Sequence, residues 1–180
     1  MGEKRQTKHF FILKNSMSTR ILGIDPGFDR LGVCVLEKEG SVETLLFSTC
    51  IVTSKKDSFE ARLATIATEL TLILKKYTPT ELAIEKLFLA NNQRTVMNVS
   101  EARGVLLYIC HINGLSVHEY SPPQIKVAVT GYGKATKNDI ALMVPKILKT
   151  HLSVNLLDDE LDAIAIALTH SAHRKMNSWK

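Results

Sequence analysis

The stretch ILGIDPGFDRLGVCVLEKEG, residues 21–40, ends an apolar run on an acidic residue and then turns at once on Pro26 and Gly27. The apolar residues on both sides of the turn predict two buried strands. A buried carboxylate without a partner costs on the order of several kcal/mol, so we expect a cation beside Asp25. The Pro-Gly pair lets the chain turn tightly where an anionic group has to approach.

A meander and a helix follow from the same pattern. The apolar character of residues 31–37 and 42–52 predicts two strands joined by a short turn, which indicates an antiparallel meander. The hydrophobic period then changes to that of a helix over residues 59–77. Asp57 and Glu60, three residues apart, predict a capping box at the start of this helix.

The rest of the chain alternates strands and helices, as parallel α/β units do. This order predicts an α/β domain with a mixed sheet, three antiparallel strands followed by parallel ones, flanked by helices. Open α/β sheets place their sites at the carboxyl ends of strands, so Asp25 and Glu85 are expected to face each other. The further elements are strands at 82–86 and 115–120, helices at 95–113 and 158–173, and two helices that begin after Ser121 and within 134–139.

The composition is that of a soluble globular protein. The 180 residues predict one folded domain over residues 18–180, and the net charge of +5 is compatible with a polyanionic partner. Three cysteines without CxxC spacing indicate neither a disulfide framework nor a zinc site and fit a reduced cytosol. Residues 1–17 contain only a four-residue apolar run, too short for a signal peptide or a membrane span, and predict a flexible extension.

The stretch LLDDELDAIAIALTH, residues 156–170, carries the densest group of acids. Asp159 and Asp162 are three residues apart, so on a helix they share one face, whereas Asp158 and Glu160 are explained as capping and first-turn charges. From this helix alone, the alternative that all four acids only decorate an N-terminus stays open. With Asp25 and Glu85 added, carboxylate oxygens predict hard cations, Mg²⁺ or Mn²⁺, two of which can support phosphodiester hydrolysis.

Four motifs in this order and spacing, GIDPG, AIEKLF, SEARGVL and DDELDAIAIALTH, resemble the RuvC family of bacterial Holliday-junction resolvases. The resemblance covers about residues 20–173 and implies an RNase H-like fold. It implies a structure-selective endonuclease in DNA recombination and repair, a homodimer that nicks two opposing strands of a four-way junction symmetrically with Mg²⁺, for which Mn²⁺ can substitute. It also implies junction-binding and branch-migration helicase partners (RuvA and RuvB) and a cytoplasmic location.

The resemblance assigns roles to individual residues. Two lysines, Lys126 and Lys137, match DNA-contacting positions of the family, and Phe88 occupies the place of an aromatic residue that stacks on bases at the opened junction. Lys134 and Arg94 are further candidates for DNA contact because they lie on loops near the site. The family's four metal-binding acids carry over onto Asp25, Glu85, Asp159 and Asp162.

Three other functions are compatible with parts of the pattern. A related nuclease that cuts flaps or RNA–DNA hybrids would have the same metal site. A non-enzymatic DNA-binding module would use its acids only as helix caps. An actin-like or sugar-kinase ATP-binding domain is disfavoured, because such proteins need two lobes and a second phosphate loop, for which this chain is too short.

Overall fold

The computed structural model describes residues 18–87, 93–150 and 156–177, with the backbone alone for 93–95 and 175–177. The expected N-terminal extension, residues 1–17, lies outside this range. Among the described helices, none combines the length and the apolar character that a membrane span requires.

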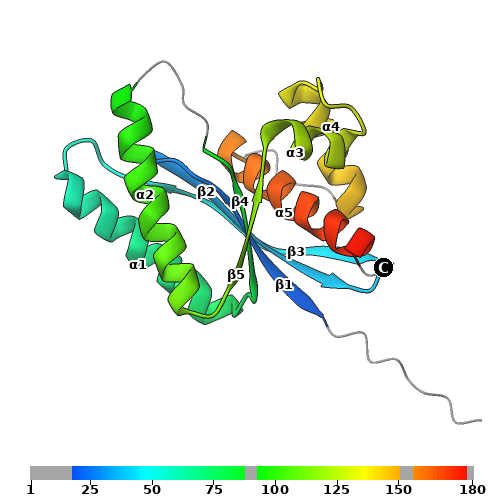
Figure 1. The fold of residues 1–180 in the computed structure, drawn as a ribbon, viewed down its shortest axis with the longest axis horizontal. Helices are drawn as coiled ribbons and strands as arrows, with labels where there is room; N and C mark the ends of the chain where they lie inside the picture. The colour runs from blue at the N-terminus through cyan, green and yellow to red at the C-terminus, as the bar shows by residue number, and fades with distance from the viewer. Residues whose placement is uncertain (1–17, 88–92, 151–155, 178–180) are drawn as a thin grey trace, which may run out of the picture.

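The strands form one five-stranded mixed sheet in the order β3-β2-β1-β4-β5 (Figure 1). The pairs β1–β2 and β2–β3 are antiparallel, whereas β4 runs parallel to both β1 and β5. The predicted α/β fold, with a meander followed by parallel strands, is therefore confirmed. The strands are β1 (Thr19–Asp25), β2 (Arg30–Glu39), β3 (Val42–Val52), β4 (Glu81–Glu85) and β5 (Ser116–Tyr120).

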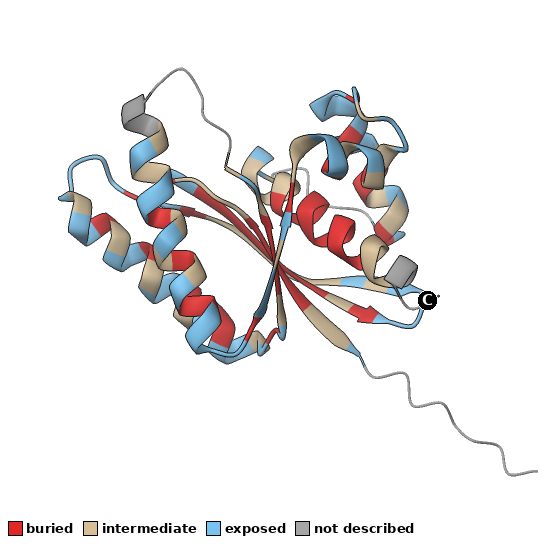
Figure 2. Cartoon of the chain, viewed as in Figure 1, coloured by how far each residue is buried: buried red, intermediate tan, exposed pale blue. Residues whose placement is uncertain are grey.

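Helices cover both faces of the sheet, two on one side and three on the other (Figure 1). The buried residues lie along the strands and on the helix surfaces that face them (Figure 2). On the first face lie α1 (Phe59–Tyr77) and α2 (Gln93–Ile112), and on the second α3 (Pro122–Thr130), α4 (Lys137–Leu148) and α5 (Asp158–Asn177).

The two hydrophobic cores follow from the alternation of side chains along β1. Leu22 and Ile24 point to the core beneath α1 and α2, whereas Ile21 belongs to the core beneath α3, α4 and α5. All three side chains are fully buried. A strand that is apolar on both faces is typical of a sheet covered on both sides.

The helix starts agree with the predicted capping signals in two cases and differ in one. The side chain of Gln124 accepts hydrogen bonds from the backbone N and the Oγ of Ser121, which confirms the predicted cap of α3. The predicted Asp57–Glu60 box is wrong, because the N-cap of α1 is Ser58, whose hydroxyl accepts from the backbone N of Ala61. The hydroxyl one residue later accepts from a free N–H group of the first turn in place of the expected carboxylate. In the KATKND segment, Thr136 caps α4.

The helix α5 lies unusually close to the sheet. A Cβ added to Gly23 in β1 would come within 2.4 Å of the carbonyl oxygen of Ala163, and one added to Gly32 in β2 would lie 1.9 Å from that of Asp159. Only glycine permits such an approach of two backbones. The first turns of α5 therefore rest directly on the end of the sheet where β1 stops.

Candidate active site

Asp25 and Glu85 stand at the carboxyl ends of two neighbouring strands. The parallel register pairs Ile24 of β1 with Ile84 of β4, so the next residue of each strand is an acid. Both acids line one pocket of about 320 Å³. The structure thus brings the two acids, which were expected to face each other, into the lining of one pocket.

The two acids of α5 occupy different positions in this site. Asp162 lines the pocket with Asp25 and Glu85, and its Oδ2 accepts from Lys137 Nζ at 3.1 Å. Asp159, nearly one turn earlier, forms an ion pair with Arg30 and accepts a long hydrogen bond from Cys50 Sγ at 3.8 Å. Asp159 therefore sits at the edge of the site, where it adds charge without lining the pocket.

Burial and neighbouring carboxylates raise the affinity of Asp25 and Glu85 for protons. Burial, followed by the charges of Asp162, Glu85 and Asp159, raises the pKa of Asp25 to about 7, and Lys137 opposes this shift. Burial and the charge of Asp162 also raise the pKa of Glu85. Such repulsion is relieved when a cation enters, so the site is built to hold more positive charge than Lys137 supplies.

The donor set fits a hard divalent cation, because the acids that line the pocket offer carboxylate oxygens and no imidazole or thiolate lines it with them. In the described part of the chain, however, no three of these acids bring ligand oxygens within 4.8 Å of one another. Asp159 and Asp162 are turned toward Arg30 and Lys137 instead. Metal binding would have to draw the carboxylates together and release these two cations.

The predicted DNA-contacting residues fall into three groups. Lys126 and Lys137 line the pocket, whereas Lys134 is exposed in the turn between α3 and α4 and does not line it. Arg94 lies in the first turn of α2 and its side chain is outside the described part of the chain, and Phe88 lies wholly outside it. The structure thus places two of the five candidates beside the acids.

Part of the pocket lining is apolar. It comprises Ile125 of α3, Ile140 of α4 and Ile166 of α5, together with Pro122 at the start of α3. These side chains also belong to, or adjoin, the second core, so α3 and α4 hold the two lysines at fixed positions above the acids. An apolar wall strengthens electrostatic interactions inside the pocket.

Arg30 is a site residue that the sequence did not predict. It begins β2, two residues before the position that pairs with Asp25, and forms an ion pair with Asp159. A hydrogen bond with Cys50, followed by the charge of Asp159, raises the pKa of Arg30. The sequence did contain an indication of this position. When a tight turn joins two antiparallel strands, the first residues of the second strand lie beside the last residues of the first, which places Arg30 near the end of β1.

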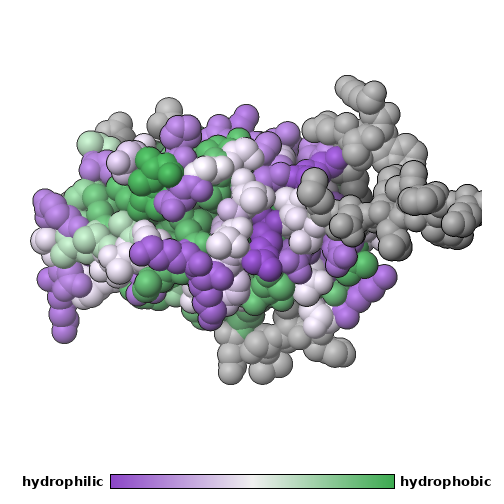
Figure 3. All heavy atoms as spheres, turned by 90° about the horizontal axis from the view of Figure 1, so that it is seen from below, coloured by the Kyte–Doolittle hydropathy of each residue, from purple (hydrophilic) through white to green (hydrophobic). Residues whose placement is uncertain are grey.

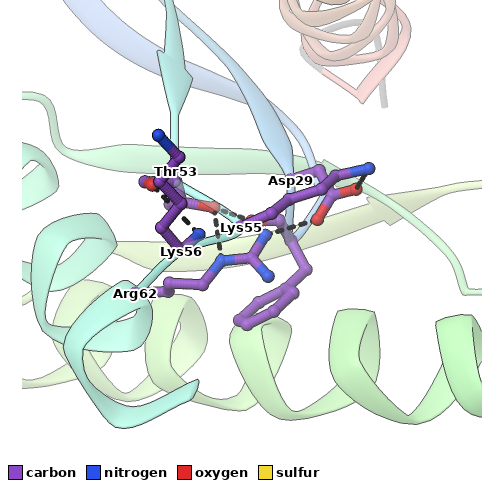
Figure 4. A network of polar contacts seen from close by, with 7 residues as sticks. Asp29, Thr53, Lys55, Lys56 and Arg62 are labelled. Carbon is purple, nitrogen blue, oxygen red and sulfur yellow. Dashed lines mark hydrogen bonds and ion pairs between the residues drawn. The ribbon is translucent and has the colours of Figure 1, made fainter. Parts of the chain in front are cut away.

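A second residue that was missed, Arg62, anchors the turn after Asp25 (Figure 4). Its guanidinium donates to Thr53 Oγ1 at 2.9 Å, pairs with Asp29, and lies 3.8 Å from the centre of the Phe28 ring. Thr53 Oγ1 also donates to the carbonyl oxygen of Phe28 at 2.7 Å. The helical spacing could have indicated this role, because Arg62 falls on the apolar face of α1 between Phe59 and Ile66.

Comparison with known proteins gives a consistent result. The family model described as "Crossover junction endodeoxyribonuclease RuvC" matches residues 21–170. The protein of that name from Petrotoga mobilis is 42% identical over 155 residues, which cover 86% of this chain and 94% of the relative. The one from Brachyspira hyodysenteriae is 37% identical over 155 residues, with coverage of 86% and 95%.

Solved structures are similar over the same region. RuvC of Thermus thermophilus matches with a TM-score of 0.79 at 32% identity, and the same protein in complex with Holliday junction substrate matches with a TM-score of 0.82 at 31% identity. Both matches cover 89% of this chain and 97% of the other. The yeast mitochondrial Holliday junction resolvase Ydc2, at 14% identity and a TM-score of 0.64, shares the fold.

Proposed function

Because the chain belongs to the RuvC family of crossover junction endodeoxyribonucleases, we propose that it resolves Holliday junctions by nicking two opposing strands of four-way DNA. The observation that carries this proposal is the meeting of Asp25, Glu85 and Asp162 in one pocket with Lys126 and Lys137. Binding of a Holliday junction by the similar Thermus thermophilus RuvC supports the choice of substrate. The proposed setting is DNA recombination and repair.

The proposed cofactor is Mg²⁺, two ions per site, with Mn²⁺ able to substitute. Asp25, Glu85 and Asp162 would hold the ions, with Asp159 as the fourth ligand once it leaves Arg30. When bound, such ions lower the pKa of a water and stabilise negative charge on the departing oxygen. Asp25 must be deprotonated to serve as a ligand, so metal affinity should rise with pH through about pH 7.

The proposed DNA track starts at the pocket. Lys126 and Lys137 would contact the phosphates next to the cleaved bond, and Lys134 on the exposed turn would extend the track. The net charge of +5 agrees with a polyanionic substrate. Arg94 and Phe88, proposed to contact a phosphate and an unstacked base, are candidates for the same track on the grounds of resemblance alone.

The proposed homodimer uses the outer face of α2. Met97, Tyr108 and Ile112 are each at least 60% exposed and recur at helical spacing, and an added Cβ at Gly104 between them would touch nothing within 4 Å. Figure 3 shows hydrophobic side chains gathered on the half of the molecule where α1 and α2 lie, at the left of that view. A flat apolar stripe with a central glycine suits a close contact between two copies of the helix.

The dimer has its own test. Tyr108→Glu places a charge in the middle of this stripe and is expected to shift the protein from dimer to monomer in sedimentation velocity. Tyr132→Glu, at a tyrosine exposed to a similar extent on the α3–α4 turn, is the matched control. If both variants stay dimeric, another surface forms the dimer.

RuvA and RuvB, which the family implies as junction-binding and branch-migration helicase partners, are proposed to deliver the junction. A cytoplasmic location is proposed with them. The three described cysteines are free, which agrees with a reducing compartment.

The function is tested by cleavage of matched substrates. A synthetic four-way junction, a linear duplex, a flap and an RNA–DNA hybrid of the same sequence are each incubated with the protein in Mg²⁺, in Mn²⁺ and in EDTA. We expect symmetric nicks in the junction alone, and none in EDTA. Cutting of the flap or the hybrid instead would indicate another nuclease activity. Equal cleavage in EDTA and in Mg²⁺ would refute the proposed metal site.

Site variants link the activity to the pocket. Asp25→Asn and Glu85→Gln are expected to abolish cleavage and to retain junction binding, because removal of negative charge does not weaken attraction to DNA. Asp57→Asn and Glu69→Gln, at exposed acids before and within α1, are the matched controls. Cleavage by Asp25→Asn at the wild-type rate would refute the assignment.

A further inference from the structure

A second group of potential metal ligands lies at the opposite end of the sheet. Glu81 begins β4, His118 lies in the middle of β5 and His170 belongs to α5, and one ligand atom of each lies within 4.8 Å of the other two. Glu85, at the other end of β4, is four residues from Glu81, or about 13 Å along a strand. This cluster is therefore separate from the pocket of the proposed active site.

The cluster is already ordered by direct contacts. His170 Nε2 lies 2.6 Å from Glu81 Oε2, and His170 Nδ1 lies 2.6 Å from the hydroxyl of Tyr120. The ring of His118 stacks on that of His170 with centroids 4.2 Å apart. Arg174 pairs with the second oxygen of Glu81. Each potential ligand is thus held in place by a neighbour before any ion arrives.

We propose that Glu81, His118 and His170 form a binding site for a divalent transition-metal ion of the zinc type. Two imidazoles and a carboxylate are a common ligand set for zinc, whereas Mg²⁺ prefers oxygen ligands alone. The fourth coordination position would face a pocket of about 230 Å³ that these residues line with Tyr120, His173 and Arg174. Water can therefore complete the coordination.

Tyr120 and Arg174 are hydrogen-bonding partners of the kind that orient zinc ligands in proteins. When His170 Nε2 binds the ion, the imidazole proton resides on Nδ1 and can be donated to the Tyr120 hydroxyl, so the hydrogen bond at 2.6 Å is kept. Arg174 keeps one oxygen of Glu81 while the other binds. Burial, with the nearby His118 and His173, lowers the pKa of His170 to about 4, so the ring is neutral at pH 7 as ligation requires.

The ion would connect the elements that carry the proposed catalytic acids. Glu81 shares β4 with Glu85, and His170 shares α5 with Asp159 and Asp162. A bond between the far ends of β4 and α5 stabilises their packing and leaves the acids untouched. The expected role is therefore stability of the fold, and Mg²⁺ should compete poorly for it.

The first experiment measures zinc binding by calorimetry on the full chain, with excess Mg²⁺ to occupy the carboxylate pocket. We expect one Zn²⁺ per chain and a rise in Tm with zinc. His118→Ala, at a half-buried residue, is expected to weaken zinc affinity at least tenfold and to remove the rise in Tm. His111→Ala, at an exposed histidine of α2, is the matched control and should behave as the wild type.

The second experiment reads the ligands directly in the unsubstituted protein. Long-range ¹H–¹⁵N spectra of histidine rings report each ring nitrogen, and zinc should shift one nitrogen of His118 and Nε2 of His170. Equal zinc affinity of wild type and His118→Ala, or unchanged nitrogen shifts on addition of zinc, would overturn the proposal. The cluster would then be a hydrogen-bonded network that contributes to packing alone.

Discussion

Gly32 lies beneath Asp159, at a distance that leaves no room for a side chain between β2 and the first turn of α5. A Cβ at Gly32 would come within 1.9 Å of the carbonyl oxygen of Asp159. In the antiparallel register, Gly32 is also the partner of Asp25. One glycine therefore sets how closely the acids of α5 approach the acid at the end of β1.

Gly32→Val is expected to push the start of α5 away from the sheet, because backbone atoms cannot yield as the end of a flexible side chain can. Cleavage of the junction should fall at least a hundredfold, and the free energy of unfolding should drop by about 1–3 kcal/mol. Junction binding, measured by gel shift, should persist. Gly133→Ala, where the added methyl meets only Val127 Cγ2 at 3.4 Å, is the control.

The pKa of Asp25 predicts a pH-dependent stability of the metal-free protein. Its value of about 7 in the folded state exceeds the ordinary 3.8, so the folded state binds more protons than the unfolded state between about pH 4 and pH 7. The contribution of Asp25 to stability should therefore decline as pH rises through this interval, whereas His170, whose pKa is lowered to about 4, contributes a rise between about pH 4 and pH 6.5. The difference in stability between wild type and Asp25→Asn isolates the decline that Asp25 causes. Chemical denaturation in EDTA at a series of pH values measures the decline.

Asp25→Asn removes this contribution and should stabilise the metal-free protein at pH 8 by roughly 1–4 kcal/mol. A smaller slope should remain from Glu85, whose pKa is also raised. Addition of Mg²⁺ to the wild type should flatten the profile, because a cation replaces the proton. If the difference in stability between wild type and Asp25→Asn in EDTA does not change between pH 5 and pH 7, the electrostatic account of the pocket is contradicted.

Arg62 and Lys55 both pair with Asp29. Substitution of each residue in turn therefore compares the contribution of a buried cation to stability with that of an exposed one. The side chain of Arg62 is 11% exposed and that of Lys55 is 80% exposed. Arg62→Met leaves buried Thr53 Oγ1 without its donor and Asp29 with Lys55 as its remaining partner, and is expected to cost about 2–4 kcal/mol of stability. It should also lower the cleavage rate, because the turn after Asp25 loses its anchor.

Lys55→Met is the matched comparison and should change both stability and cleavage little, since exposed ion pairs contribute little. Hydrogen exchange of the amides in the turn would report the loss of the anchor in Arg62→Met. Equal stability of the two variants would mean that the hydrogen bonds of Arg62 in the network of Figure 4 do not stabilise the fold.

Lys137 is expected to exchange its partner when DNA binds. In the described structure it pairs with Asp162 at 3.1 Å, which raises the pKa of its ammonium group. If a phosphate takes the place of that carboxylate, Lys137→Gln should weaken junction binding and reduce the slope of log K against log salt by about one. Lys75→Gln, at an exposed lysine in the last turn of α1, should leave the slope unchanged.

The order of strands and helices was readable from the sequence because hydrophobic period and capping residues are local signals. The acids at the ends of β1 and β4 were readable for the same reason, since the strand ends are marked by Pro26-Gly27 and by the charged pair Glu85-Lys86. The shared face of Asp159 and Asp162 followed from helical spacing. The cap of α1 was misassigned by one residue, because Asp57 and Ser58 are both good cap residues and only backbone geometry distinguishes them.

The tertiary structure decided which of these charges meet. Arg30 reaches Asp159, and Asp162 but not Asp159 lines the pocket, because the approach of α5 to two glycines of the sheet sets the depth of each side chain. Glu81, His118 and His170 are far apart along the chain, and no spacing rule predicts their contact. Such contacts depend on strand register and on helix position over the sheet, which arise only when both cores pack.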